Sequence, residues 1–304
     1  MFKLNKIYNE NCLDTIKKIP DNFIDCIVTS PPYWKLRDYG VEGQMGQEET
    51  PQEYVNTLVF VFKEIRRILK PEGTVWLNLG DTYTGGGRGQ GSKLSKIQKT
   101  NKGSLLPPIK TPKGFKRKDL CMIPARVAIA LHDDGWYLRS EIIWKKNSMP
   151  ESVADRPTRS HEMIYLLTKK GNYYYDADAI KEKSKTIKYD KRGDDRKRKP
   201  TELINGVRNS GLWEMANKRD VWDIPNQPCK EAHFAVFPLE IPRICIAAGC
   251  PKHGIVYDPF GGSGTTGIAA LQLDRNFILS ELNPEYVKIA EKRISPSLNQ
   301  MKLF

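Results

Sequence analysis

The sequence predicts an α/β fold in which helices cover both faces of a mostly parallel sheet. Two observations support this prediction. Short apolar runs bounded by turn residues alternate with segments of helical periodicity at both ends of the chain, and a glycine-rich turn joins a strand to a helix near the C-terminus. The chain has 304 residues, 39% of them hydrophobic, which is enough for one sizeable core with an appended element or for two modest domains.

The first third of the chain contains two predicted strands and a long helix. Residues 24–28 form a short apolar run that is typical of a buried strand, and the run leads into a turn that begins at Thr29. Residues 51–69 have apolar side chains at helical spacing, with Thr50 placed as the N-cap, proline in the first turn and a Pro-Glu-Gly stop. The next predicted strand is 74–79.

The middle of the chain interrupts this rhythm. Residues 85–118 are rich in Gly, Lys, Ser and Pro and have no stable apolar period, which predicts a long mobile loop. A helix is predicted at 124–134 and strands at 136–144 and 163–168. Residues 181–200 form a second polar tract.

The C-terminal part returns to strand–helix alternation. The predicted order is the strand Ile255–Asp258, the glycine-rich turn, a helix at 265–273, a strand at 276–281 and a helix at 284–293. The sequence shows no internal repeat.

The net charge of +13 is concentrated in two segments. Residues 85–120 carry a surplus of +9, and residues 181–220 carry a surplus of +6. Such segments favour a polyanionic partner, whose phosphates bind Lys and Arg and release counterions. Charge alone would also fit two solvated, disordered loops, which is the less favoured interpretation.

Other sequence features narrow the class of protein. No run approaches the roughly 20 apolar residues that a membrane span needs, and the first residues lack the pattern of a secretory signal. We therefore expect a cytoplasmic protein without a membrane partner. The six cysteines form no CxxC pair and the four histidines have no ligand spacing, so we expect reduced thiols and no metal.

The glycine-rich turn at 256–266 predicts a binding site for a small anion. Glycine lets the backbone approach a ligand, and the start of the following helix offers free N–H groups. The spacing fits neither a dinucleotide nor a triphosphate, whereas an amino-acid carboxylate fits. Glu281, at the end of the next strand, can accept both hydroxyls of a ribose. Together these features describe S-adenosylmethionine, although the turn alone could serve only strand–helix packing.

The sequence Thr29-Ser30-Pro31-Pro32-Tyr33-Trp34 follows a buried strand and carries the second candidate site. The prolines donate no N–H groups and leave carbonyls that can accept hydrogen bonds, and the serine hydroxyl adds another acceptor. A planar –NH2 group needs such acceptors. The aromatic side chains offer a face on which a flipped base can stack.

This turn suggests methylation of an exocyclic base amine. Such an amine is a poor nucleophile because its lone pair is delocalised into the ring. Acceptors that hold both N–H groups would direct the lone pair at a sulfonium methyl group for in-line attack. No covalent enzyme intermediate is needed. Taken in isolation, the Pro-Pro turn could also be purely structural.

Together the two motifs resemble those of a known family of enzymes. It resembles the amino-methylating DNA methyltransferases of restriction–modification systems and phages over nearly its whole length. Residues 29–33 look like the catalytic (S/D/N)PP(Y/F) motif, 258–264 like the FxGxG cofactor motif, and 233–238 like the segment that helps to hold the methionine moiety. Residues 144–162 are similar to a block found in many of these enzymes.

The order of the motifs implies an architecture. The catalytic motif precedes the cofactor motif, as in the circularly permuted β class, which implies a Rossmann-like, mostly parallel seven-stranded sheet with residues 6–11 as its far edge strand. The expected organisation is a catalytic half at 1–180 with a mobile basic loop at 85–120, a target-recognition segment at 181–225 and a cofactor-binding half at 226–304. The two basic segments are expected to bind DNA.

The expected functional residues fall into three groups. The catalytic residues are Ser30, Pro31, Pro32 and Tyr33. The cofactor-binding residues are Asn11, Thr29, His233, Ala235, Phe237, Pro238, Asp258, Phe260, Gly261, Gly262, Ser263, Gly264, Thr265, Thr266, Glu281 and Asn283. The side chains expected to contact DNA are Trp34, Arg88, Lys93, Lys116, Arg117, Lys118, Arg196, Arg198 and Arg208.

Several alternatives stay open at this point. Ser-Pro-Pro-Tyr is commoner in cytosine-N4 enzymes and Asp-Pro-Pro-Tyr in adenine-N6 enzymes of the family, so the resemblance favours cytosine N4 over adenine N6. An RNA methyltransferase and a catalytically silent DNA-binding protein are more distant alternatives. The expected partners are double-stranded DNA and, in a restriction pair, a cognate endonuclease that acts separately. The sequence does not decide between a monomer and a homodimer.

Three charged residues have two interpretations each. Asp81 could line the base pocket or cap the next turn, with the structural role slightly favoured. Arg156 and Arg159 could pair with phosphates or with Glu151 and Glu162.

Overall fold

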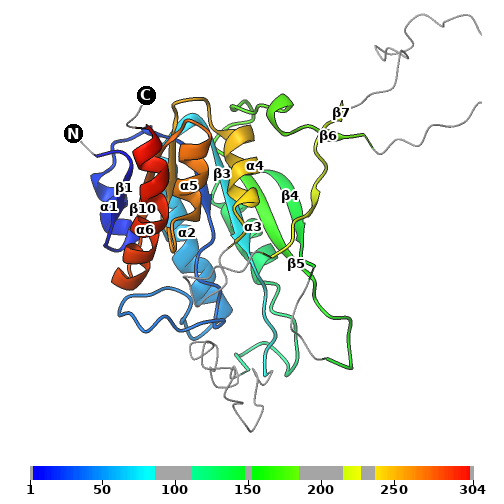
Figure 1. Ribbon diagram of the computed structural model, residues 1–304. Coiled ribbons are helices and arrows are strands. Elements are labelled where there is room, and N and C mark those ends of the chain that lie inside the picture. Colours follow the sequence, from blue (N-terminus) through cyan, green and yellow to red (C-terminus); the bar gives the residue numbers. More distant parts are fainter. Residues whose placement is uncertain (1–2, 86–110, 148–152, 185–214, 227–236, 302–304) are drawn as a thin grey trace, which may run out of the picture.

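A twisted sheet between two layers of helices organises the chain in the computed structural model, which describes residues 3–85, 111–147, 153–184, 215–226 and 237–301 (Figure 1). The strands of this sheet are β1 (Lys6–Tyr8), β2 (Ile24–Thr29), β3 (Leu69–Leu79), β4 (Tyr137–Lys145), β5 (His161–Thr168), β8 (Val221–Asp223), β9 (Ile255–Asp258) and β10 (Asn276–Ser280). The α-helices are α1 (Cys12–Lys18), α2 (Pro51–Ile68), α3 (Ile123–Asp133), α4 (Glu240–Gly249), α5 (Thr265–Gln272) and α6 (Pro284–Met301). The short strands β6 (Glu182–Lys183) and β7 (Met215–Ala216) pair with each other separately.

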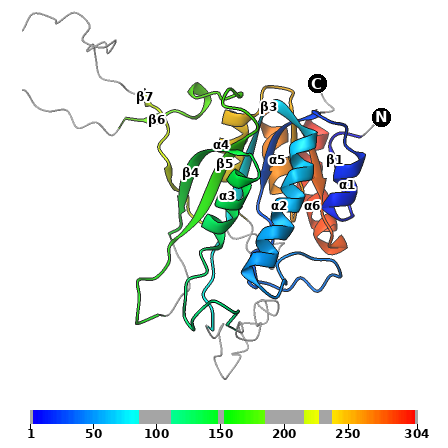
Figure 2. The ribbon, with the colours of Figure 1, turned by 180° about the vertical axis from the view of Figure 1, so that it is seen from behind.

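The strand order confirms the predicted fold class. The order is β1-β10-β9-β2-β3-β5-β4-β8. The first five strands are parallel, β5 runs antiparallel to both β3 and β4, and β8 is parallel to β4. Helices α4, α5 and α6 cover one face, and α1, α2 and α3 cover the other, as the two opposite views show (Figures 1 and 2).

Each face of the sheet has its own apolar core. On the side of α1–α3, Phe62 and Trp136 meet edge to face with ring centroids 6.3 Å apart. On the side of α4–α6, Trp76 and Trp222 pack among the aliphatic side chains of the helices. All six residues of β2 are buried because this strand lies at the centre of the sheet and is covered on both faces.

The structure confirms the local signals predicted for α2. Thr50 accepts a hydrogen bond from the backbone N–H of Glu53, and the Glu53 carboxylate accepts one from the N–H of Thr50, each at 3.1 Å. This capping box stabilises the helix by about 1 kcal/mol. The helix ends at Ile68, and β3 begins at the next residue, earlier than the predicted strand at 74–79.

The sheet has eight strands among the described residues, one more than the predicted seven. The additional strand is β8, which lies within the segment 181–225. It adds to β4 through the bond from the N–H of Ile143 to the carbonyl of Asp220, at 2.8 Å, and the Trp144 indole donates to the carbonyl of Ile224, also at 2.8 Å. These bonds satisfy groups on β4 that would otherwise face an open sheet edge.

The predicted edge strand at 6–11 is shorter than expected. It ends at Tyr8, because Asn11 caps helix α1 by accepting a hydrogen bond from the N–H of Leu13 at 3.0 Å. Helices α1 and α4 were not predicted, and α6 continues past the predicted end at 293. The predicted polar tract at 181–200 begins with β6 in its described part.

The described ends of the predicted mobile loop at 85–120 are fixed to each other. The N–H of Thr84 donates to the carbonyl of Asp119, that of Lys118 to the carbonyl of Thr84, and that of Cys121 to the carbonyl of Thr82, each at 2.9 Å. Residues 86–110 lie outside the described part of the chain. Residues 118–121 are thereby held against residues 82–84.

Three further findings concern the described residues only. None of their helices is both long enough and apolar enough to cross a membrane. They contain no cluster of three or more His, Cys, Asp or Glu side chains that could hold a metal ion. The five described cysteines are buried thiols, and Cys229 lies outside this set.

Candidate active site

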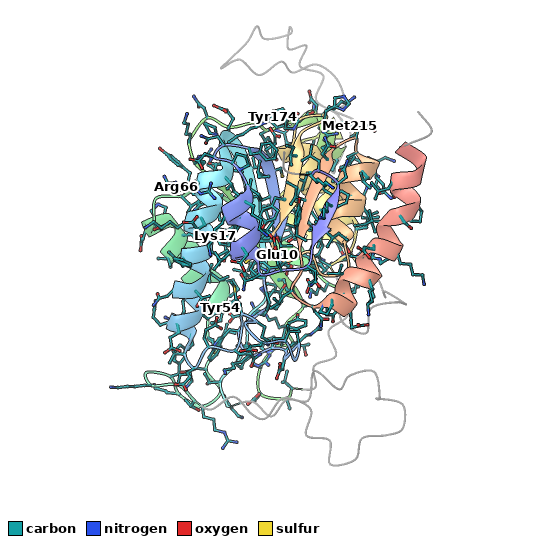
Figure 3. The ribbon with its side chains drawn as sticks, turned by 90° about the vertical axis from the view of Figure 1, so that its left-hand side faces the viewer. Glu10, Lys17, Tyr54, Arg66, Tyr174 and Met215 are labelled. Carbon is teal, nitrogen blue, oxygen red and sulfur yellow. The ribbon has the colours of Figure 1, made fainter. Side chains whose placement is uncertain are left out.

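The predicted catalytic and cofactor motifs lie at the same end of the sheet, where the parallel strands have their carboxyl ends. The catalytic turn follows the carboxyl end of β2, and the glycine-rich turn follows the carboxyl end of β9, which is the neighbouring strand. Ligands of open parallel sheets bind at this end. Tyr54, which contacts the catalytic turn, lies toward the lower end of the molecule in Figure 3, and Tyr174 and Met215 lie at the upper end.

A cluster of polar groups surrounds the catalytic turn, and we call it the hydroxyl cluster: Ser30, Tyr33, Asn78 and Glu162. The Tyr33 hydroxyl lies 2.7 Å from Glu162 Oε2 and 2.9 Å from Asn78 Oδ1. The Ser30 hydroxyl lies 3.2 Å from that of Tyr33 and 3.3 Å from Asn78 Oδ1. The cluster joins the loop after β2 to strands β3 and β5.

The ring of Tyr33 lies against the backbone of the loop that leaves β3. Gly80 has no side chain, and a Cβ there would lie 2.4 Å from Tyr33 Cε2. The Tyr54 hydroxyl donates to the carbonyl of Pro32 at 2.8 Å. That carbonyl, expected from the sequence to be free, already accepts this bond and keeps one lone pair.

A largely buried ion pair supports the hydroxyl cluster. Lys146 pairs with the Oε1 atom of Glu162, and both side chains are nearly inaccessible to solvent. The ammonium group also lies 4.2 Å from the centroid of the Trp144 ring, within range of a cation–π interaction. Burial, and then the neighbouring Glu162 carboxylate, raise the pKa of Tyr33 well above its usual value, so the phenol keeps its proton.

Trp34 corrects one prediction. The sequence analysis placed it among the residues that contact DNA, but the side chain is buried at 1% exposure. Its indole donates to the carbonyl of Glu48 at 3.0 Å and fixes the loop that follows the catalytic turn. The aromatic side chain therefore packs in the core beside α2, and Tyr33 is the aromatic residue left at the site.

Asp258 connects the two motifs. Its Oδ1 atom accepts hydrogen bonds from the Thr29 hydroxyl at 2.7 Å and from the N–H of Phe260 at 3.0 Å, and its Oδ2 atom accepts one from the Thr266 hydroxyl at 2.7 Å. Burial raises the pKa of Asp258 to about 6, although these three hydrogen bonds oppose the shift. The carboxylate thus holds the end of β2, the turn and helix α5 together.

Glu281 closes the other side of the glycine-rich turn. Its carboxylate accepts hydrogen bonds from the N–H groups of Gly262 and Asn283, each at 2.8 Å. Burial raises its pKa, and these backbone bonds lower it in part. Each carboxylate oxygen has a second lone pair, so Glu281 can still accept hydroxyl groups of a ligand.

The turn itself needs glycine at Gly264. This residue has φ +82°, in the left-handed region, and a Cβ there would lie 2.9 Å from Ile294 and 3.0 Å from Ala290 of α6. From the same helix, Arg293 donates to the carbonyl of Ser263 at 2.6 Å and to the hydroxyl of Thr265 at 3.2 Å. Helix α6 thereby fixes the shape of the turn.

The remaining predicted cofactor residues differ in position. Asn11 acts as the cap of α1, Phe237 packs against the core on the side of α4–α6, and Pro238 is buried at the start of α4. The N–H of Gly261 donates to the carbonyl of Ser280 at 2.7 Å. His233 and Ala235 lie outside the described residues.

Three of the predicted DNA-contacting residues are exposed in the loop between β3 and α3: Lys116, Arg117 and Lys118. Lys118 pairs with Asp155 at 2.5 Å, and both side chains are largely exposed. The other basic residues that were expected to contact DNA lie outside the described part of the chain: Arg88, Lys93, Arg196, Arg198 and Arg208.

Asp81, for which the sequence left two roles open, has structural hydrogen-bond partners. Its Oδ1 atom accepts hydrogen bonds from the N–H groups of Thr82 and Ile123, each at 2.9 Å, which ties the loop after β3 to the start of α3. Its Oδ2 atom lies 3.3 Å from Arg159, so this arginine forms an ion pair with Asp81. Arg156 lies over the Tyr83 ring at 3.7 Å.

Sequence reasoning missed Asn78, Gly80, Lys146 and Arg293. These residues join the site through contacts across the sheet or between helices, which no local pattern reveals. Asn78 did carry one signal, since it is a polar residue inside the apolar strand β3.

An open depression of about 530 Å³, lined by Glu72, Lys170 and three further residues including Tyr174, lies at the opposite end of the sheet from the two motifs (Figure 3).

Comparisons with known proteins agree with these two motifs. A family model described as DNA methylase, covering N6 and N4 enzymes, matches residues 24–292. Type II methyltransferase M.SmaI of Serratia marcescens is 46% identical over 95% of this chain and 90% of that protein. Type II methyltransferase M.Cfr9I of Citrobacter freundii is 43% identical over 95% of this chain and 87% of that protein.

Solved structures share the fold. The PvuII DNA methyltransferase, described as cytosine-N4-specific, aligns with a TM-score of 0.64 over 97% of this chain and 91% of that chain, at 20% identity. A putative DNA modification methylase of Thermus thermophilus, solved with S-adenosyl-L-methionine, aligns with a TM-score of 0.59 over 96% of this chain and 93% of that chain, at 21% identity. Since the family model spans β2 to α6 and relatives of 46% and 43% identity align along nearly the whole chain, the chain belongs to the N6/N4 family of DNA methylases.

Proposed function

We propose that this DNA methylase transfers a methyl group from S-adenosylmethionine to the exocyclic N4 amine of a cytosine flipped out of duplex DNA. The observation that carries the proposal is the direct link between the two motifs. Thr29, the last residue of β2, donates to Asp258, the last residue of β9, at 2.7 Å. Because of this bond, Ser30, which is the first acceptor of the catalytic turn, is only one residue along the chain from a direct contact with the cofactor motif.

The residues around the glycine-rich turn fit S-adenosylmethionine. Gly261 lets the turn pack closely on β10, since a Cβ there would lie 2.8 Å from Leu279, whereas beside Gly262 the nearest atom to a Cβ would be Phe260 O at 3.8 Å, which leaves room next to the backbone. The start of α5 offers N–H groups to a carboxylate, and Glu281 offers lone pairs to ribose hydroxyls. When bound, this cofactor supplies a methyl group on a positively charged sulfur.

The residues of the catalytic turn hold the base amine. Tyr33 presents a ring on which the flipped base can stack. The Ser30 hydroxyl and the backbone carbonyls of the turn accept the amine hydrogens, which directs the nitrogen lone pair away from the ring. The hydroxyl cluster fixes Ser30 and Tyr33 in place before the substrate arrives, so little reorganisation is needed at the moment of reaction.

Cytosine is the proposed base because Ser30 occupies the variable position of the motif. In the family that this chain resembles, serine there is commoner in cytosine-N4 enzymes and aspartate in adenine-N6 enzymes. The family model covers both activities, so the base is decided by experiment. The relatives named as type II methyltransferases support a sequence-specific enzyme of a restriction–modification system.

DNA binding follows from the same geometry. The exposed basic residues Lys116, Arg117 and Lys118 lie in the loop between β3 and α3, which leaves the sheet at the end that carries the catalytic turn. We assign them to phosphate contacts beside the flipped base. The segment 181–225 is proposed as the target-recognition region, with its β8 part anchored to the sheet.

The deciding experiment measures methyl transfer from labelled S-adenosylmethionine to unmethylated duplex DNA, followed by mass spectrometry of the digested nucleosides. N4-methylcytosine is the expected product. N6-methyladenine would refute the assignment of the base and leave the site intact. Activity on RNA alone would refute the DNA substrate, and full activity of a Tyr33→Ala variant would refute the assigned site.

A further inference from the structure

The hydroxyl cluster has fewer hydrogens than contacts. Four oxygen–oxygen distances of 2.7–3.3 Å connect Ser30, Tyr33, Asn78 and Glu162. Only the two hydroxyl groups bring hydrogens to these contacts, because the carboxylate and the amide oxygen are acceptors. The amide of Asn78 cannot be turned to donate here, since its nitrogen already donates to the carbonyl of Met163 at 3.2 Å.

One more proton would supply a hydrogen for a third of the four contacts in the cluster. With Glu162 ionised, Tyr33 donates to it and Ser30 donates to Asn78 or Tyr33, which leaves two contacts without a hydrogen. With Glu162 protonated, Glu162 donates to Tyr33, and Tyr33 donates to Asn78. A site short of hydrogens, in a poorly solvated place, is suited to accept a proton.

The methylation reaction releases one proton at this position. We propose that Glu162 is the final acceptor of the proton that the base amine loses, and that the proton arrives through the hydroxyl groups of Ser30 and Tyr33. This inference rests on the proposed function, in which the Ser30 hydroxyl holds the amine. Glu162 acts through Tyr33 and touches neither substrate nor cofactor, so it is a positioning and proton-accepting residue.

The amine nitrogen forms the N–CH3 bond, and the electron pair of the broken C–S bond stays with sulfur. One amine proton moves to Ser30 Oγ, the Ser30 proton moves to the Tyr33 oxygen, and the Tyr33 proton moves to Glu162. The products are a neutral N-methylated base and a protonated Glu162, which later loses its proton to solvent.

The charges that face Glu162 suit this role. Lys146, on the loop after β4, places a positive charge beside the carboxylate before the reaction. Tyr33 stays protonated because its pKa is raised, so it passes on a proton without becoming a permanent anion. On the same strand, burial and then Arg159 lower the pKa of His161, which therefore adds no positive charge at neutral pH.

The test compares single-turnover methyl transfer across pH in the wild type, Glu162→Gln and Tyr33→Phe. A proton acceptor in this role gives the wild-type rate an acid limb, along which the rate falls. Glu162→Gln should be slower by about 10²-fold, the lower end for loss of a general base, and should lose this acid limb. Tyr33→Phe keeps the ring and the ion pair but interrupts the route, so it should lose the same limb.

The controls separate proton transfer from a structural defect. Glu141→Gln changes an exposed glutamate on β4, the strand that neighbours β5, and should keep the wild-type rate and pH profile. The double variant Glu162→Gln/Lys146→Gln removes the lysine charge that the single variant leaves unpaired. If the double variant recovers the wild-type rate, or if Glu162→Gln retains the acid limb, the proposal is overturned.

The same digests identify the methylated base, so the two proposals fail separately. N6-methyladenine with the expected pH profiles would refute cytosine but support the role of Glu162, because both amines lose a proton in the same way. N4-methylcytosine with an unchanged Glu162→Gln variant would support the proposed function and overturn the role of Glu162.

Discussion

Gly80 lies against the ring of Tyr33, and its replacement by alanine tests how closely the site depends on the position of that ring. The added Cβ would lie 2.4 Å from Cε2 and 2.7 Å from Cδ2 of Tyr33. Carbon atoms pack at about 3.5–4.0 Å, so the ring must retreat by about 1 Å. Gly80 is not among the residues with positive φ, so the effect of alanine is steric and not due to backbone strain.

The retreat would stretch the bonds from the Tyr33 hydroxyl to Glu162 and Asn78, now 2.7 and 2.9 Å, toward distances at which they no longer hold. A misplacement of about 1 Å at a reacting site costs about 10²-fold in rate. Overpacking of this kind also lowers the free energy of unfolding by about 1–3 kcal/mol. We therefore expect Gly80→Ala to lose about 10²-fold in kcat and to unfold at lower urea concentration.

Steady-state methyl transfer and urea unfolding measure both effects. The affinity for S-adenosylmethionine, measured by calorimetry, should stay unchanged because the atoms nearest to a Cβ at Gly80 belong to Tyr33 and not to the glycine-rich turn. Gly171→Ala is the matched control, since a Cβ there would lie 3.8 Å from Tyr137, an ordinary contact. A Gly80→Ala enzyme with wild-type kcat and stability would show that the ring position does not limit the reaction.

Three further predictions concern the cofactor turn and the basic residues. Glu281→Gln should raise the Kd for S-adenosylmethionine by about tenfold or more, measured by calorimetry, because a hydrogen bond to a charged group is worth about 1.5–3 kcal/mol; an unchanged Kd would exclude Glu281 from the site. The pKa of Asp258 is raised by burial from 3.8 to about 6, so its contribution to stability is present below pH 3.8 and lost as the pH rises through about 6. Lowering the pH from about 7 to about 5 should therefore stabilise the wild type relative to Asp258→Asn by about 1 kcal/mol in urea unfolding, and a parallel pH dependence of the two would contradict this. Replacing Lys116, Arg117 and Lys118 by alanine should reduce the slope of log K for DNA against log salt by about 3, whereas an equal slope would rule out phosphate contacts.

The sequence could predict those parts of the fold and site that depend on neighbours along the chain. The cap at Thr50 and the proline after it fix the start of α2 locally, and the structure confirms them. Trp34 could not be placed in the same way, because its burial depends on a loop that returns to cover it through Glu48. An aromatic residue beside a catalytic turn looks the same in the sequence whether it faces solvent or the core.

The hydroxyl cluster could not be predicted from the sequence for the same reason. Tyr33 and Glu162 are brought together by the pairing of β3 with β5, and that pairing runs antiparallel in a sheet otherwise dominated by parallel neighbours. A register shift of one residue would turn Glu162 to the other face of β5. Contacts of this kind depend on registers that alternating patterns cannot specify when both faces of a strand are apolar.

The order of strands in the sheet has a consequence for how the chain is made. β9 and β10 insert between β1 and β2, so strands within residues 255–280 separate two strands within residues 6–29. During synthesis, β1 and β2 have no neighbour on their facing edges until residues 255–280 have left the ribosome. Such long-range parallel pairing is slow, and unpaired edges invite aggregation. A nascent chain therefore carries its catalytic turn on a half-built sheet for most of its synthesis, with β2 paired to β3 alone, and the cofactor turn joins it only after β9 has been made.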